Sequence, residues 1–207
     1  MTRPFLHRFL HRREGATSVE VALLTPLVFF SLLSGIDLGL YVWRWNQSVQ
    51  AVRVIVRQAT ISDPVSSDLK TMTGLETGAA PGDPIAAYER RCALGSATCT
   101  GGDFDQAAAD RLFYGPVGRI CGDATSRATA GLCDLAPRLR PENVWVTYRA
   151  SGVDSAGVAG GARPLVTIET RGAPSDVVML NHIVPNIFLK LPATEVTLLA
   201  EDLRSST

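Results

Sequence analysis

The chain has 207 residues, no formal net charge and 46% hydrophobic residues. This length suits one compact domain with additional elements, and the balanced charge excludes a broadly basic nucleic-acid-binding protein. The charge is nevertheless unevenly placed, because residues 1–15 contain four arginines against one glutamate. The sequence therefore begins with a basic leader.

The segment that follows the leader is apolar over an unusual length. No Lys or Arg occurs between Arg13 and Arg44, and Val19–Trp43 is almost continuously hydrophobic. A helix that spans a bilayer needs about 20 mainly apolar residues. The hydrophobic region of a cleavable secretory signal is shorter, about 7–15 residues, and ends at a small-residue site. The segment therefore predicts one retained transmembrane helix.

Aromatic and charged residues predict how this helix is oriented. Tyr41, Trp43 and Trp45 cluster at its far end, as aromatic residues do at membrane interfaces. The arginines of the leader favour a cytoplasmic N-terminus, although the far flank also carries arginines. We expect Asp37, about one turn before the aromatic cluster, to be solvated at the interface. Glu20, near the cytoplasmic end of the helix, is likewise expected to lie in the headgroup region.

Four cysteines, all downstream of the apolar segment, indicate an oxidising compartment. Cys92, Cys99, Cys121 and Cys133 form no C-x-x-C pair, which argues against a zinc site. An even number of exported cysteines suits two disulfides, for which three connectivities exist. We expect Cys92–Cys99 and Cys121–Cys133, because these pairs close the shortest loops. Four reduced, buried thiols are the alternative.

The periodicity after the membrane segment predicts that the helix continues. Val49, Val52, Val56 and Ala59 recur at three- or four-residue spacing, which indicates an amphipathic helix to about residue 60. Residues 62–88 are rich in Ser, Gly, Asp and Pro and indicate a loop. We then expect a short helix over 85–92, a disulfide-bounded loop over 93–103 and a helix over 105–114.

Strand patterns dominate the last third of the chain. Residues 144–149 and 164–171 alternate and are rich in β-formers, so a hairpin with a long, flexible connection is expected. Residues 193–203 predict a last strand. Val177–Leu191 is apolar and interrupted by Pro185, and a helix, a strand and a membrane-apposed segment all remain open. The predicted class is α+β, with a long N-terminal transmembrane helix and a small disulfide-bonded exported domain built on an antiparallel sheet.

The junction between leader and helix carries a motif. Gly15 ends the basic leader, Glu20 is the fifth residue after it, and the hydrophobic helix follows at once. This arrangement resembles the class III signal of type IV prepilins, in which a membrane aspartyl peptidase cuts after the glycine. The resemblance implies Ala16 as the new N-terminus of a 192-residue chain. It also implies that Glu20 of one subunit neutralises the α-amino group of another.

A longer stretch resembles the TadE-like family, pilin-like proteins of tight-adherence (Flp) pilus systems. The matching positions are Gly15, Val19, Glu20, Ala22, Pro26 and Gly35. Val21 stands where the family usually has an aromatic residue. The resemblance covers about 30 residues and implies a pilin-like fold, in which an extended helix packs against a small sheet.

Small residues within the helix offer a surface for close packing. Ser31, Gly35 and Gly39 form a stripe at four-residue spacing, which lets membrane helices approach one another. The alternative is that glycines are simply frequent in membrane helices. Pro26 is expected to kink the helix or to free a carbonyl group.

Catalytic motifs are missing from the sequence. It has no phosphate-binding glycine loop, no H-E-x-x-H and no G-x-S-x-G. His182 lies among apolar neighbours, as a packed or surface histidine does. Asp103, Asp105 and Asp110 lack calcium-loop spacing and indicate a solvated face. We therefore expect no enzymatic activity, no cofactor and no metal.

The combined hypothesis is a TadE-like minor pilin or pseudopilin that acts in assembly of a tight-adherence pilus. It divides the chain into a cytoplasmic leader (1–15), a transmembrane and extended helix (16–60) and a periplasmic domain (61–207). The implied partners are a prepilin peptidase, other pilins or pseudopilins, the assembly platform in the bacterial inner membrane and the lipid bilayer, with no nucleic acid. The alternative is an uncleaved, membrane-anchored periplasmic scaffold of a secretion or envelope complex.

Overall fold

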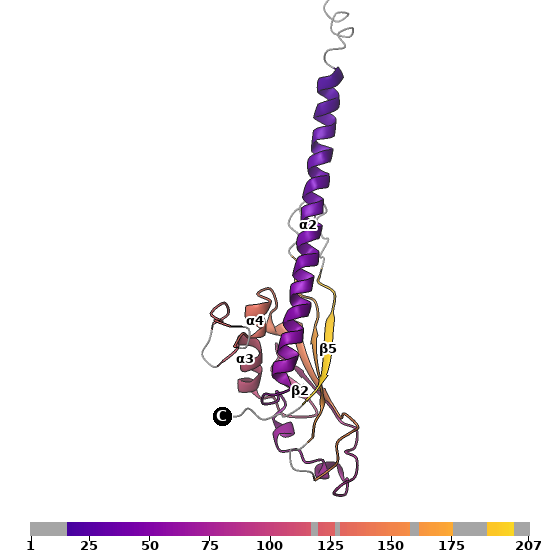
Figure 1. The fold of residues 1–207 in the computed structure, drawn as a ribbon, viewed down its shortest axis with the longest axis vertical. Helices are drawn as coiled ribbons and strands as arrows, with labels where there is room; N and C mark the ends of the chain where they lie inside the picture. The colour runs from indigo at the N-terminus through magenta and orange to yellow at the C-terminus, as the bar shows by residue number, and fades with distance from the viewer. Residues whose placement is uncertain (1–15, 117–119, 127–128, 158–161, 176–189, 201–207) are drawn as a thin grey trace, which may run out of the picture. The chain divides into compact units, whose positions relative to one another are not determined.

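The computed structural model describes residues 16–116, 120–126, 129–157, 162–175 and 190–200. Within them a long helix, α2 (Ala16–Ala59), precedes several short helices and a five-stranded sheet (Figure 1). The chain forms two compact units, and α2 belongs to both. Its residues up to Val42 belong to the first unit, and those from Trp43 onward belong to the second. The second unit thus begins at Trp43, well before the end of α2. The helix itself ends at Ala59, close to the end predicted from the sequence at about residue 60.

The five strands form one antiparallel sheet in the order β2-β1-β3-β4-β5, and the predicted α+β class is confirmed. The strands are β1 (Glu89–Ala93), β2 (Thr98–Thr100), β3 (Val144–Arg149), β4 (Leu165–Thr170) and β5 (Thr194–Leu199). β3 and β4 pair along their whole length, with Val146 opposite Ile168. These pairings confirm the predicted late strands. Their β-branched residues suit a sheet.

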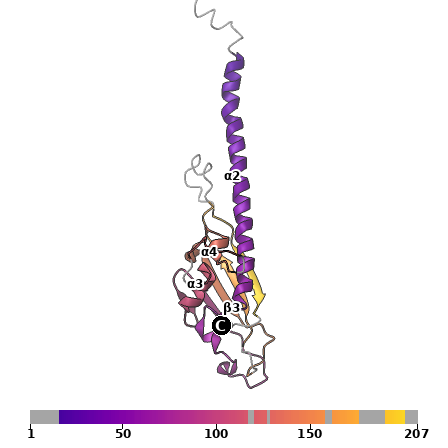
Figure 2. The ribbon, with the colours of Figure 1, turned by 60° about the vertical axis from the view of Figure 1, so that its left-hand side comes forward.

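The core lies between the sheet and the second half of α2. Val52, Ile55 and Val56 of α2 are fully buried, and so are Val146 of β3 and Ile168 of β4. Figures 1 and 2 both show this half of α2 running along the sheet. The spacing of buried residues on α2 repeats every three or four positions, which is the amphipathic stripe that the sequence predicts.

A buried hydrogen bond ties the loop after α2 to the sheet. The Tyr148 hydroxyl on β3 accepts a bond from the Val65 backbone N–H at 3.0 Å. Complete burial raises the pKa of Tyr148 well above its usual range, so the phenol stays neutral. The helix itself closes at Thr60, whose hydroxyl donates to the Arg57 carbonyl at 2.7 Å.

Two local predictions in the middle of the chain are wrong. The expected helix over 85–92 is replaced at Glu89 by strand β1, and the expected loop over 93–103 contains β2. Glu89–Ala93 has little strand pattern of its own, but all five of its residues pair with β3. Tertiary pairing therefore overrides the local preference. The predicted helix over 105–114 is confirmed as α3 (Gln106–Tyr114).

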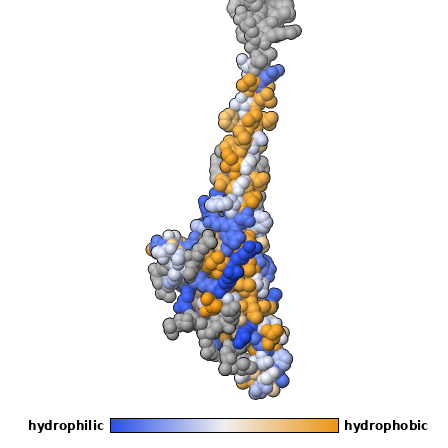
Figure 3. Space-filling model, viewed as in Figure 1, coloured by the Kyte–Doolittle hydropathy of each residue, from blue (hydrophilic) through white to orange (hydrophobic). Residues whose placement is uncertain are grey.

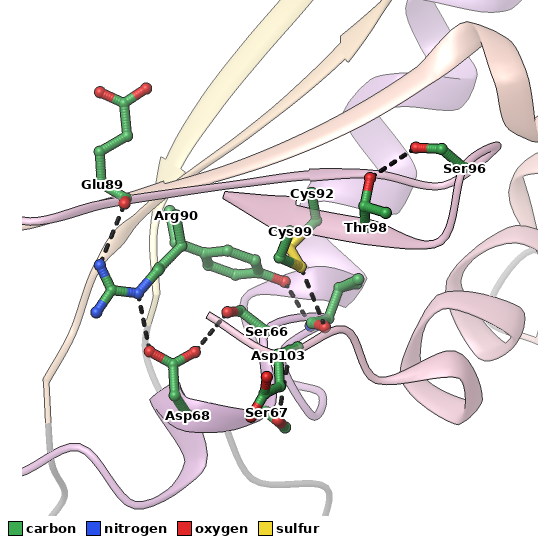
Figure 4. Close-up of a disulfide and its surroundings, with 12 residues drawn as sticks. Ser66, Ser67, Asp68, Glu89, Arg90, Cys92, Ser96, Thr98, Cys99 and Asp103 are labelled. Carbon is green, nitrogen blue, oxygen red and sulfur yellow. Dashed lines mark hydrogen bonds and ion pairs between the residues drawn. A yellow bond between two sulfur atoms is a disulfide. The ribbon is translucent and has the colours of Figure 1, made fainter. Parts of the chain in front are cut away.

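The disulfides have the expected nearest-neighbour pairing. Cys92 on β1 lies directly opposite Cys99 on β2 and is bonded to it, which closes the hairpin (Figure 4). Cys121 is bonded to Cys133 of α4 (Leu132–Leu135). The structure contains no free cysteine among the residues described. Both bonds lie in the second unit, which agrees with an oxidising compartment.

The acidic residues after β2 serve the fold. Asp105 caps α3 by accepting from the Ala108 N–H at 3.1 Å, and it pairs with Lys70 at 2.5 Å. Nearby, Asp68 accepts bonds from Ser66 and from Arg90, whose Nε lies 2.8 Å from Oδ2 (Figure 4). These contacts hold the loop after α2 against the hairpin.

Replacing Asp105 by alanine should lower the free energy of unfolding by about 1–2 kcal/mol, the usual value of a helix N-cap. Partial burial of Asp105 alone would raise its pKa, but the bonds from Lys70 and Ala108 outweigh burial and hold the pKa below its ordinary value. A lowered folded-state pKa contributes stability above about pH 4, and this contribution is lost as the pH falls through the folded pKa.

The measurement is chemical denaturation of the full chain and its variant across acidic and neutral pH. Asp110→Ala is the matched control, because Asp110 is exposed and accepts only from Gln106 of its own helix. A stability difference at Asp105 that persists undiminished in strongly acidic buffer would contradict the proposed charge contribution.

Candidate assembly helix and processing site

The first part of α2 presents apolar side chains on nearly all sides. The exposed fraction of its large apolar side chains runs from 36% at Leu33 to 70% at Leu23. Figure 3 shows this part of α2 as mostly hydrophobic, with hydrophilic residues gathering where the second unit begins. Exposing such a surface to water costs about 25 cal/mol per Å². It therefore requires lipid or other apolar helices around it.

The described residues contain one helix that is long and apolar enough to cross a membrane, Ser18–Ala59. Its most apolar stretch is not buried within the chain itself, unlike the core helix of a soluble domain. This composition supports single-pass membrane anchoring near the N-terminus.

Two carboxylates bracket the apolar stretch. Glu20 and Asp37 are 17 residues apart, which is about 25 Å along a helix, so both fall near the edges of a hydrocarbon core about 30 Å thick. Glu20 is exposed. Asp37 is only 7% exposed, so the expectation of a solvated carboxylate is wrong.

The predicted small-residue stripe lies on one face of α2. Ser31, Gly35 and Gly39 succeed one another at four-residue spacing, and all three are exposed. A Cβ atom built on either glycine would meet no atom of the described structure within 4 Å. Packing among the described residues therefore does not require these glycines. The absence of side chains at these positions would allow a neighbouring helix to approach closely.

Pro26 lies inside α2 without ending it. Proline has no N–H, so the carbonyl four residues earlier, that of Ala22, lacks its usual donor. One turn away, the Thr25 hydroxyl donates to the Val21 carbonyl at 2.6 Å. Side-chain bonds of this kind help membrane helices to accommodate a proline.

The processing residues are only partly within the described structure. Gly15 and the leader lie outside it, and Ala16 is the first described residue of α2. Glu20 follows Ala16 by one helical turn, so the two residues lie on the same side of the helix. The side chain of Glu20 is exposed on this side of the helix.

Comparison with known families decides what kind of segment this is. Residues 15–57 match the family model described as TadE-like protein. The N-terminal segment is TadE-like. No curated protein and no solved structure matches the chain. The match confirms the predicted resemblance and supports a part in tight-adherence pilus assembly.

The residues of the TadE-like match do not coincide with either compact unit of the structure. The match begins at Gly15 and ends at Arg57, two residues before the end of α2. It thus includes both the exposed apolar half of the helix and the half that packs on the sheet. The sheet and both disulfides lie outside the matched residues.

Aromatic and basic residues mark the end of the apolar stretch of the TadE-like helix. Trp43 and Trp45 are exposed, and Tyr41 is half-buried. Between the tryptophans, Arg44 donates from Nη1 to the Ser175 carbonyl at 2.7 Å, which ties α2 to the segment after β4. Amphipathic aromatic side chains at this position fit the headgroup region of a bilayer.

The remaining sites that the sequence singled out are structural or outside the described residues. Within the part of the chain that is described, no group of three His, Cys, Asp or Glu side chains is arranged to hold a metal ion. Asp105 and Asp110 make the bonds given above, and Asp103 is exposed. His182 and most of Val177–Leu191 lie outside the described residues.

Sequence reasoning missed one buried charge on the sheet. Glu169 of β4 is 8% exposed and lies on the face opposite the core. Arg91 of β1 pairs with it at 3.1 Å, and Arg171 also contacts it. The only sequence signal was the alternation in β4, which places Glu169 and Ile168 on opposite faces. A buried carboxylate with two arginine partners holds β4 and β1 across the intervening strand.

Proposed function

We propose that this TadE-like chain is a minor pilin or pseudopilin that acts, without catalysis of its own, in assembly of a tight-adherence pilus. The observation that carries the proposal is the TadE-like match over a helix whose apolar surface has no cover within the chain. Before assembly, lipid surrounds such a helix in the bilayer. During assembly, the helix packs among the helices of other subunits.

The proposed processing step is hydrolysis of the peptide bond between Gly15 and Ala16 by a prepilin peptidase. Water adds across this bond, leaving a carboxylate on the leader and a free α-amino group on Ala16. The chain keeps the apolar helix and gains a positive charge at its N-terminus. Glu20 of a neighbouring subunit pairs with that charge in low dielectric and sets the axial register of the two helices.

The proposed location is the bacterial inner membrane, with the leader in the cytoplasm and the disulfide-bonded domain in the periplasm. The arginines of the leader and the two disulfides of the second unit support this orientation. The proposed partners are the peptidase, other pilins or pseudopilins and the assembly platform.

The experiment that tests the proposal is intact-mass and N-terminal analysis of the protein purified from its native membrane, together with a Gly15→Ala variant. We expect the wild type to begin at Ala16 and the variant to keep residues 1–15. A cleft that accepts only glycine excludes the added methyl group. Gly35→Ala is the matched control, since it makes the same change at an open helix position and should be cleaved normally.

A wild-type chain that retains its leader would reject pilin-type processing. It would support instead a permanently anchored periplasmic scaffold, which is the alternative function. Cleavage at a different bond would point to a signal peptidase of another class.

A further inference from the structure

One end of the second unit gathers the connections next to the point where α2 enters. We define this end, the collar, as residues 43–48, 136–143, 171–175 and 190–193. Arg44, Ala136, Arg138, Pro174 and Leu191 line one small cavity, which shows that all four segments meet. Figures 1 and 2 both show β5 and α4 reaching the same end.

Backbone contacts hold the collar together. The Leu191 N–H donates to the Ala173 carbonyl at 2.9 Å, and Pro174 pairs with Lys190 as an isolated bridge. Asn143 donates from its side chain to the Arg171 carbonyl at 3.0 Å and accepts from the Arg171 N–H at its own carbonyl. The collar is therefore a defined surface built on the ends of β3, β4 and β5.

The collar is strongly basic. It carries five cations against one acid, Glu142; the cations are Arg44, Arg138, Arg140, Arg171 and Lys190. All but Arg44 are exposed, and the side chains of Arg140 and Arg171 retain 72% and 57% of their accessible surface. Glu142 lies 3.8 Å from Arg140 in an exposed surface pair, and Arg171 pairs with Glu169 of β4. Five cations against these two carboxylates still leave an excess of positive charge.

The connections at the other end of the sheet have the opposite charge. They comprise residues 60–88, which follow α2, and residues 150–163, which join β3 to β4. Their acids are Asp63, Asp68, Glu76, Asp83 and Asp154, against Lys70 and Arg163. Asp63 and Asp68 are partly neutralised by Arg111 and Arg90. The second unit keeps its positive excess at the collar and a smaller negative excess in these connections.

We propose that the collar is a docking surface for anionic phospholipid headgroups on the leaflet that faces the exported domain. Arginine side chains bind phosphate oxygens through paired N–H donors, and exposed basic residues beside a membrane helix are attracted to acidic lipids. Trp43 and Trp45 belong to the collar, are exposed, and suit the headgroup region of a bilayer.

The polarity of the second unit gives this docking a direction. Attraction of the collar and repulsion of the acidic far end hold the domain with one orientation against the bilayer. The inference needs only the membrane anchor, and it holds whether or not the chain is processed after Gly15.

The test is chemical modification of arginines by a glyoxal reagent, read by mass spectrometry on the full chain in lipid nanodiscs. Discs of phosphatidylcholine alone are compared with discs that also contain phosphatidylglycerol. We expect modification of Arg138, Arg140 and Arg171 to slow about fivefold in the anionic discs. Arg149 and Arg163, at the other end of the sheet, serve as internal controls and should react equally in both discs.

Two further arms isolate the cause. Raised salt should remove the protection, because it screens headgroup charge. Arg138→Gln/Arg140→Gln should lose the protection of Arg171, whereas the matched Arg149→Gln/Arg163→Gln variant should keep it. Equal rates at the collar in the two discs, or equal slowing at Arg149 and Arg163, would overturn the proposal. Protection by inorganic phosphate in phosphatidylcholine discs would assign the collar to a soluble anion and overturn the lipid docking.

Discussion

A Glu20→Gln variant is expected to be cleaved after Gly15 and yet to fail in pilus assembly. Glutamine keeps the shape of the side chain and removes the charge that is proposed to neutralise the new amino group at Ala16. Removing one partner of an ion pair in low dielectric costs about 3 kcal/mol or more, which is over about a hundredfold in each helix contact. Assembly repeats this loss at every such contact.

The measurement combines two readings from the same cells. Intact mass reports cleavage, and surface pili sheared from the cells and quantified by immunoblot report assembly. Glu142→Gln is the matched control, because Glu142 is exposed in the second unit and lies outside the helix. Normal pilus amounts from processed Glu20→Gln would reject the register role. An uncleaved variant would assign Glu20 to recognition by the peptidase instead.

An Ile55→Ala variant is expected to destabilise the second unit by about 2–5 kcal/mol, the range for removing a large aliphatic side chain from a core. Ile55 is fully buried in the part of α2 that belongs to the second unit. The apolar first part of the helix should be unaffected.

The stability of the full chain in detergent micelles is measured by denaturation followed through near-ultraviolet circular dichroism. This signal reports packing of the domain and is insensitive to the helix that remains in the micelle. Ile61→Ala is the matched control, because Ile61 is 56% exposed just after the helix and should change stability by less than about 0.5 kcal/mol. Equal losses at both positions would show that α2 does not contribute its residue 55 to the core.

Features carried by local pattern were predictable from the sequence. The transmembrane helix and its amphipathic continuation follow from apolar residues at continuous and then helical spacing. β3 and β4 follow from alternation, and α3 follows from a short apolar period. The TadE-like segment was recognisable because its motif lies within a single helix and needs no long-range contact.

Features that depend on distant partners were not predictable. β1 has weak strand character and forms because β3 is available to pair with it. Glu169 is paired with Arg91 of β1, which lies 78 residues earlier in the sequence. Each of these outcomes is set by residues far away in the sequence.

The sequence by itself determined the membrane helix, the Gly15–Glu20 motif and the class of the exported domain, because each depends on neighbours within a few residues. Only the tertiary structure decided that the basic collar forms. Arg44, Arg138, Arg171 and Lys190 are scattered over the chain and carry no common pattern. They meet because antiparallel pairing returns the ends of β3, β4 and β5 to the point where α2 enters the sheet.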